Sequence, residues 1–315
     1  MMRSDTASQQ SRLTLGPLLF HWPPEKIRDF YFRIADEAPV DTVHIGEAVC
    51  AKRLPLIEKA LEEARERLLA AGKEVVLSSL AIIADEKDMA PTAALSGEPD
   101  LLVEANDIAA LAGLDGRPHV IGPFVNVYNE DTLSFLARRG AVRICLPPEM
   151  HKDAIAALAA KSDAELEIFA FGRVPLALSA RCYHARVNDL HKDNCRFVCN
   201  QDPDGMTVET LTGAPFLVVN GVQTLSFAYN NLIADLADLQ ELGVNRFRLS
   251  PHDVDMIAVA EIFRNALDGE IDAEEALDCL ACELPIARFA NGFFHRVEGM
   301  TWKARSAGIA RPARH

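Results

Sequence analysis

Residues 40–83 read VDTVHIGEAVCAKRLPLIEKALEEARERLLAAGKEVVLSSLAII, and they contain a strand, a helix and a second strand in succession. Residues 40–47 and 73–83 are rich in β-branched and other apolar side chains, which favours strands. Residues 53–72 place their apolar side chains on one helical face and end at Gly72, a residue that commonly terminates helices. Short loops between such elements predict a parallel β/α unit.

The same alternation continues along most of the 315-residue chain. Further strands are predicted over residues 13–22, 99–105, 119–129, 141–147, 165–178 and 244–251. Further helices are predicted over residues 23–39, 88–96, 106–114, 130–140, 149–161, 230–243 and 253–269. This repetition predicts an α/β fold, a closed or partly closed TIM-barrel-like (β/α) barrel. The rhythm breaks after residue 178 at a cysteine-rich loop, and residues 206–227 predict a small antiparallel insertion that turns at Asn220 and Gly221.

We therefore expect one barrel-like domain over residues 13–302, with a disordered tail at residues 1–12 and a flexible tail at residues 303–315. The polar start shows no secretory signal, and no run of about 18 apolar residues occurs, so a cytoplasmic protein without a membrane span is expected. The net charge of −14 argues against general binding of nucleic acid, because it repels the phosphate backbone.

Three of the seven cysteines lie close together in the polar segment 181–199, RCYHARVNDLHKDNCRFVC. Cys182, Cys195 and Cys199 have few apolar neighbours to pack against, so they do not fit the pattern of buried core residues. Several thiolates from one loop favour zinc or an iron–sulfur cluster over calcium or magnesium. Cys50 is the predicted fourth ligand, because it also follows a predicted strand. A reducing cytosol disfavours disulfides.

The remaining cysteines have other interpretations. Cys145 lies in the apolar run AVRICLP and is predicted to be a core residue. Cys279 and Cys282 form a C-x-x-C pair, a spacing that redox dithiols and metal sites both use. The surrounding residues 272–284 have the apolar spacing of a helix, so packing against the core is the alternative. This pair is the main alternative to Cys50 as the source of the fourth ligand.

Polar side chains follow several predicted strands, where chemistry gathers in α/β barrels. The residues at these ends are Glu47, Cys50, Glu104, Asn126, Arg173 and His252. Histidines that titrate near neutral pH are acid–base candidates, but a structural role is the equal alternative for each. They are His44, His184, His191 and His252. No catalytic residue is therefore assigned.

Residues 167–182, EIFAFGRVPLALSARC, resemble the signature of the U32 peptidase-like family, in which Glu-x-Phe-x-x-Gly precedes a cysteine-rich stretch. Glu167, Phe169, Gly172 and Cys182 keep this pattern, and the resemblance extends over most of the chain.

Two residues of the same segment depart from the family pattern. Pro175 and Leu178 stand where many members carry a cysteine and a tyrosine. Together with the placement of the cysteines, these departures resemble the UbiV branch of the family. The resemblance runs from about Leu13 to Trp302.

The UbiV-branch resemblance implies an iron–sulfur subunit of an oxygen-independent hydroxylase that acts on the aromatic ring of ubiquinone precursors. The implied partners are a UbiU-like U32-family protein in a heterodimer, a UbiT-like lipid-carrier protein and a prenylated quinone precursor. The resemblance also implies a [4Fe–4S] cluster, and its ligands are Cys50, Cys182, Cys195 and Cys199. We expect Arg181 and Arg196 to offset the negative charge of such a cluster.

Two alternatives come from other classes of protein. Four cysteines suit zinc as well as iron–sulfur, so a structural zinc-binding scaffold remains open. A U32-type protease or an RNA-modifying relative is the other alternative. A protease requires an activated nucleophile, which cannot be assembled from this sequence, and the negative charge argues against binding RNA.

Overall fold

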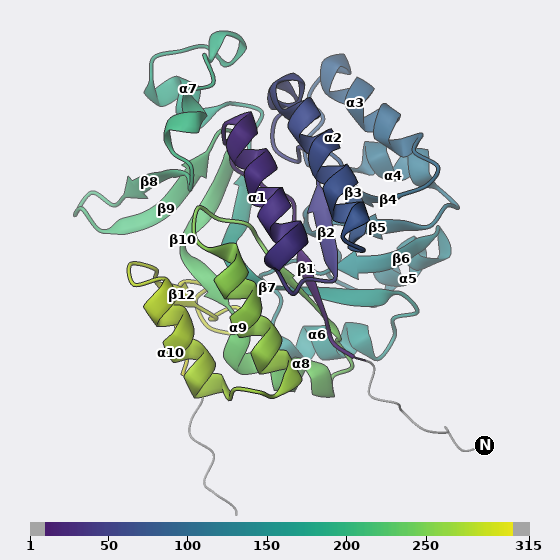
Figure 1. Ribbon diagram of the computed structural model, residues 1–315, viewed down its shortest axis with the longest axis vertical. Coiled ribbons are helices and arrows are strands. Elements are labelled where there is room, and N and C mark those ends of the chain that lie inside the picture. The colour runs from purple at the N-terminus through teal and green to yellow at the C-terminus, as the bar shows by residue number, and fades with distance from the viewer. Residues whose placement is uncertain (1–9, 305–315) are drawn as a thin grey trace, which may run out of the picture.

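The computed structural model describes residues 10–304, and parallel strands surrounded by helices dominate the fold (Figure 1). Within these residues the barrel strands are β1 Arg12–Leu15, β2 Thr42–Ile45, β3 Glu74–Ser78, β4 Leu102–Ala105, β5 His119–Ile121, β6 Ala141–Cys145, β7 Glu165–Leu178 and β11 Arg246–Leu249. Consecutive strands pair in parallel, and β11 pairs in parallel with both β1 and β7, so the sheet closes on itself. The predicted TIM-barrel-like fold is confirmed as a closed barrel.

Helices follow the barrel strands and cover the outside of the sheet (Figure 1). They are α1 Pro24–Glu37, α2 Leu54–Ala70, α3 Glu86–Ser96, α4 Ile108–Leu114, α5 Glu130–Arg138, α6 Lys152–Ala159, α8 Leu236–Glu241, α9 Met256–Asp268 and α10 Ala273–Glu283. In α2, the buried residues Ile57, Ala60, Ala64 and Leu68 recur at spacings of three and four, and together with apolar strand residues they form one core. No helix within residues 10–304 is both long and apolar enough to cross a membrane.

The predicted barrel elements differ from the observed ones mainly in length. The predicted strands 13–22 and 119–129 end early, after Leu15 and Ile121, because a proline two residues later cannot donate a ladder hydrogen bond. The predicted tails lie mostly outside the described residues, although Arg12 already belongs to β1.

The barrel interior is ionic, whereas branched apolar side chains usually fill such barrels. Arg248 Nη2 lies 2.6 Å from both Glu104 Oε1 and Glu167 Oε2, and the three side chains are at most 2% exposed. Burial is the largest influence and raises the pKa of each carboxyl, but the Arg248 charge, His44 and the other cations and hydrogen-bond donors nearby together outweigh it. The pKa of Glu104 is therefore well below its usual range, and that of Glu167 is about 2.

A second ionic layer lies two residues earlier on β7 and β11, as the period-two alternation of strands requires. Glu165 Oε2 lies 3.0 Å from Nε of both Arg246 and Arg143. Arg143 Nη2 also contacts Glu74 Oε2 at 3.0 Å. Charge pairs thus join β3, β4, β6, β7 and β11 across the barrel, in addition to the ladders between neighbouring strands.

The predicted antiparallel insertion is confirmed. Its strands are β8 Met206–Glu209, β9 Pro215–Asn220 and β10 Gln223–Asn231, and β10 pairs with the part of β7 beyond the barrel and with β12 Phe289–Ala290. The β9–β10 hairpin turns at Gly221, whose φ of +63° suits glycine. The predicted helix 230–243 is reduced to α8, because β10 continues to Asn231 and pairs with β7.

Candidate metal centre

Four cysteines from two distant segments meet at one cavity of about 20 Å³. Cys50, Cys182, Cys195 and Cys199 all line this cavity, which we call the cysteine cavity, and all four are free thiols. A volume of this size holds one or two water molecules. Between residues 10 and 304, no three Cys, His, Asp or Glu side chains are grouped closely enough to hold a single metal ion.

The loop after β2 places Cys50 at the cavity. Gly46 has a φ of +135°, and a Cβ there would lie 2.5 Å from the Ser78 carbonyl oxygen, so the close approach of β2 and β3 requires glycine. Glu47 Oε1 then accepts hydrogen bonds from the backbone N–H groups of Val49 (2.7 Å) and Cys50 (3.0 Å). The loop is therefore held by the buried carboxylate of Glu47, which the sequence marked only as a polar residue at a strand end.

The other three cysteines lie on the segment between β7 and β8, which contains the short helix α7 Tyr183–Val187 and two 3-10 turns. Cys182 directly precedes α7, Cys195 follows the first turn, and Cys199 lies within the second. His184 is buried and fastens this segment to the hairpin. Its Nδ1 accepts from the Gly221 N–H at 2.8 Å, so Nε2 carries the proton and donates to Asp202 at 3.1 Å.

Arg53 supplies a buried positive charge beside the thiols. Its side chain is 1% exposed, lines the cysteine cavity, and lies 3.8 Å from Glu47 Oε1. Arg53 also donates to the Leu19 carbonyl and to Asn220 Oδ1, each at 3.1 Å. These contacts hold the guanidinium in place before any ligand binds.

The cations that line the cysteine cavity are not the two that the sequence predicted. Arg181 and Arg196 are exposed and do not line the cavity. The cations that line it are Lys52, Arg53 and Lys192. Arg53 lies only three residues after Cys50, yet helical and strand periodicity gave no sign that its side chain would be buried.

Burial raises the pKa of the Cys50 and Cys199 thiols, and the Arg53 charge opposes that rise. A metal must displace protons from these thiols, and Arg53 stabilises the thiolates that result. The donor set, four thiols with a buried cation, suits a negatively charged metal–thiolate centre.

Asp204 holds the end of the cysteine-rich segment against the barrel. Its carboxylate lies 2.7 Å from Arg173 Nη2, accepts from the Tyr229 hydroxyl at 2.7 Å, and contacts His252 Nδ1 at 2.6 Å. His252 Nε2 in turn accepts from the Arg173 N–H at 3.0 Å. Both ring nitrogens of His252 are occupied, as are those of His184, so neither is free to activate a nucleophile.

The remaining candidates lie elsewhere. His44 is fully buried in the barrel, where its Nδ1 lies 3.3 Å from Glu104 Oε1. His191 is 80% exposed, and Asn126 is an exposed turn residue with a φ of +62°. None of these three side chains lines the cysteine cavity.

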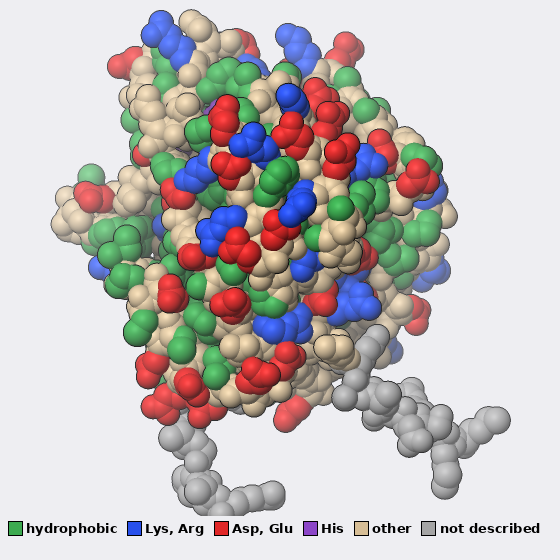
Figure 2. Space-filling view, in the orientation of Figure 1, with side chains coloured by type: hydrophobic (Ala, Val, Ile, Leu, Met, Phe, Trp, Pro, Cys, Tyr) green, Lys and Arg blue, Asp and Glu red, His purple; other side chains and the backbone are tan. Residues whose placement is uncertain are grey.

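The other cysteines also lie away from the cavity. Cys145 is fully buried, as predicted, beside Glu167 in the barrel interior. Cys279 and Cys282 lie on α10, in the predicted helix, and line a groove against α9 together with several acidic residues. Figure 2 shows acidic side chains gathered at the lower left, where Figure 1 places α10. Cys282 is exposed, so the alternative that the pair packs into the core is wrong for this residue.

The fold and this site define a closed α/β barrel with a four-cysteine cavity at its carboxyl-terminal face. Comparison with protein families places the chain in peptidase family U32, whose model matches residues 31–303, and the chain belongs to that family. The family resemblance seen in the sequence is thus confirmed.

Similar solved structures are distant barrel proteins. A truncated 3-deoxy-D-arabino-heptulosonate 7-phosphate synthase from Thermotoga maritima is 12% identical, with 89% of this chain and 90% of that chain covered and a TM-score of 0.43. Tryptophan synthase from Mycobacterium tuberculosis is also 12% identical, with coverage of 89% and 95% and a TM-score of 0.35.

Proposed function

We propose that this chain is the iron–sulfur subunit of an oxygen-independent hydroxylase, as in the UbiV branch of family U32. In this proposal it acts on the aromatic ring of ubiquinone precursors together with a UbiU-like partner and a UbiT-like lipid carrier. Cys50, Cys182, Cys195 and Cys199 would hold a [4Fe–4S] cluster, which supplies electron transfer when bound.

One observation carries the proposal. Cys50 is 132 residues or more from the other three cysteines in the sequence, yet all four thiols line one cavity. Cys145, Cys279 and Cys282 do not line it. Packing alone gives no reason for thiols of distant segments to gather beside buried Arg53, because apolar residues would fill the same space at lower cost.

The residues around the cavity have separate tasks in this function. The four thiols bind the iron atoms after they lose their protons. Arg53 offsets the negative charge of the thiolates, and Glu47 holds the backbone at Cys50. His184 fastens the loop to Gly221. Together these contacts would support a cluster held by the four thiols.

Metal content tests the proposal directly. Protein purified without oxygen should show a broad absorption band near ~400 nm that bleaches on reduction, with about four irons per chain. Cys195→Ala with Cys199→Ala should lose the iron, and the matched double variant Cys279→Ala with Cys282→Ala should retain it. Iron retained in the first double variant would refute the ligand assignment, and a colourless protein with zinc would favour the structural scaffold instead.

The biological role has its own test. Loss of this protein should impair ubiquinone formation in cells grown without oxygen and leave it unchanged in aerated cells. An equal defect under both conditions would refute the oxygen-independent role, even if the cluster is present.

A further inference from the structure

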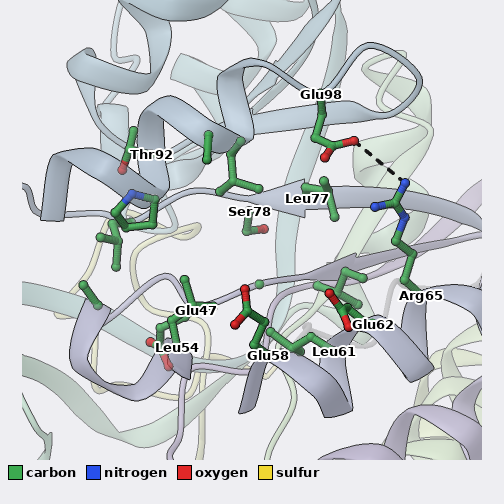
Figure 3. Close-up of a pocket in the computed structure, with 17 residues that line it drawn as sticks. Glu47, Leu54, Glu58, Leu61, Glu62, Arg65, Leu77, Ser78, Thr92 and Glu98 are labelled. Atoms are coloured by element: carbon green, nitrogen blue, oxygen red, sulfur yellow. Dashed lines mark ion pairs between the residues drawn. The ribbon is translucent and has the colours of Figure 1, made fainter. Parts of the chain in front are cut away.

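A second cavity, of about 300 Å³, lies between α2 and α3 at the carboxyl ends of β2 and β3. We call it the α2–α3 pocket (Figure 3). Ligand pockets commonly have volumes from about 300 Å³ upward, and barrel enzymes place them at this face. The pocket therefore has the size and the position of a site for a small molecule.

The walls of the α2–α3 pocket are mainly apolar. The larger aliphatic side chains that line it are Ile45, Leu54, Leu61, Leu77, Leu80 and Leu95. Three carboxylates from α2 and from the segment after α3 also line it, namely Glu58, Glu62 and Glu98. Figure 3 shows Arg65, the one Lys or Arg among the lining residues, directed to Glu98, and the two groups lie 3.8 Å apart. This excess of carboxylates repels anions.

Glu47 joins this pocket to the cysteine cavity. It lines the pocket with a side chain that is only 3% exposed. Oε1 accepts from the Cys50 N–H at 3.0 Å, while Oε2 has no hydrogen-bond partner among the described residues. Oε2 is open to the pocket, so a hydroxyl group of a ligand that enters there can donate a hydrogen bond to it.

We propose that the α2–α3 pocket binds an uncharged ring compound with a hydroxyl group that donates to Glu47, directly beside Cys50. The apolar walls select the ring, the carboxylates exclude anions, and Glu47 orients the hydroxyl toward the side that carries the cysteines. The link to a cluster rests on the proposed function, but binding in the pocket does not.

Fluorescence titration with 2-naphthol tests the binding site. This probe has an apolar ring system and one hydroxyl, and we expect a dissociation constant on the order of 0.1–1 mM for a ligand of its size. 2-Naphthoate, of similar shape but anionic, should bind at least about tenfold more weakly because of the carboxylates. Equal binding of the two probes would overturn the proposed selectivity.

Two matched pairs of variants locate the probe. Leu61→Trp fills the pocket and should weaken binding of 2-naphthol at least about tenfold. Leu69→Trp makes the same change at an exposed position two turns later on α2 and should leave binding unchanged. Should Leu61→Trp fail to fold, Ala94→Trp replaces it, because Ala94 lines the pocket from α3. Ala93→Trp is then the matched control, since Ala93 is an exposed neighbour that does not line the pocket. Binding that survives both filling variants would overturn the proposal.

Iron content and the electron paramagnetic resonance spectrum separate this inference from the proposed function. If the cluster is present, 2-naphthol should alter the spectrum of its reduced form in the wild type and not in Leu61→Trp. An unaltered spectrum, with binding intact, would refute the proximity to Cys50. If the protein lacks iron, and the wild type binds 2-naphthol while Leu61→Trp does not, the cluster is refuted and the pocket assignment stands.

Discussion

Replacing Arg248 by methionine should destabilise the barrel strongly, because Arg248 is the cation between two fully buried carboxylates. Its Nη2 lies 2.6 Å from both Glu104 and Glu167, and methionine keeps much of the volume while removing the charge. Truncating one partner of a buried ion pair costs about 3–5 kcal/mol, since an uncompensated charge is left behind.

The acidity of Glu167 gives an independent magnitude. Its pKa falls from 4.5 to about 2, with burial opposing and the Arg248 charge as the largest favourable cause. Since one pKa unit corresponds to about 1.4 kcal/mol, the charged form contributes about 3 kcal/mol to the stability. Both routes predict a loss of roughly 3–5 kcal/mol at pH 7 in Arg248→Met.

The pH dependence should change sign in this variant. In the wild type, the Glu167 contribution is complete above pH 4.5 and is lost as the pH falls toward 2, because the carboxylate takes up a proton. Without Arg248, burial raises the pKa of both carboxyls, so Arg248→Met should be more stable at pH 5 than at pH 8.

Guanidinium denaturation at pH 8, 7 and 5, followed by far-ultraviolet circular dichroism, measures both effects. Arg67→Met is the matched control, since Arg67 makes a bidentate but exposed pair with Asp36 and should cost no more than about 1 kcal/mol. A similar loss in the two variants, or a variant Arg248→Met that is equally stable at pH 5 and pH 8, would refute the reasoning.

Three further predictions concern the cysteine cavity. Arg53→Met should lower the reduction potential of a bound cluster by roughly 40–130 mV, because a Coulomb energy of about 1–3 kcal/mol is lost when the charge is removed. Potentiometry measures this shift, and an unchanged potential would exclude Arg53 as the compensating charge. Gly221→Ala should destabilise the protein and reduce its iron content, since a Cβ there would lie 2.9 Å from Arg53 Nη2. Gly213→Ala is the control, with a positive φ but no atom within 4 Å, and should keep its iron; equal iron in the two variants would contradict this steric argument. Loading iron and sulfide should slow tryptic cleavage within residues 181–196, because metal binding orders the loop that carries its ligands. Unchanged cleavage would count against binding of the cluster by this loop.

Much of the fold was predictable from the sequence because it depends on local periodicity. The helix over residues 53–72 appears as α2, and the long strand 165–178 appears as β7 with the same bounds. Apolar spacing specifies such elements wherever they lie. Predicted strands failed at their ends, where proline and the loss of a ladder partner decide the last residue.

The candidate site was only partly predictable. The polar neighbours of Cys182, Cys195 and Cys199 marked them as unsuited to the core, which is wrong for Cys199, because the folded loop buries it. The position of Cys50 after a strand suggested that it joins them. The sequence thus determined the β/α repeat and proposed which cysteines to bring together.

Only the tertiary structure decided the electrostatic environment. Arg53 is buried by Leu19 and Asn220, which are 34 and 167 residues away in the sequence. Arg248 faces two carboxylates, and Asp204 gathers partners from β7, β10 and the loop after β11. Whether a charged residue is exposed or buried depends on partners that distant segments supply, because only such partners offset the cost of removing the charge from water. Local patterns carry no record of those partners, so the barrel closure and the charges within it became visible only in three dimensions.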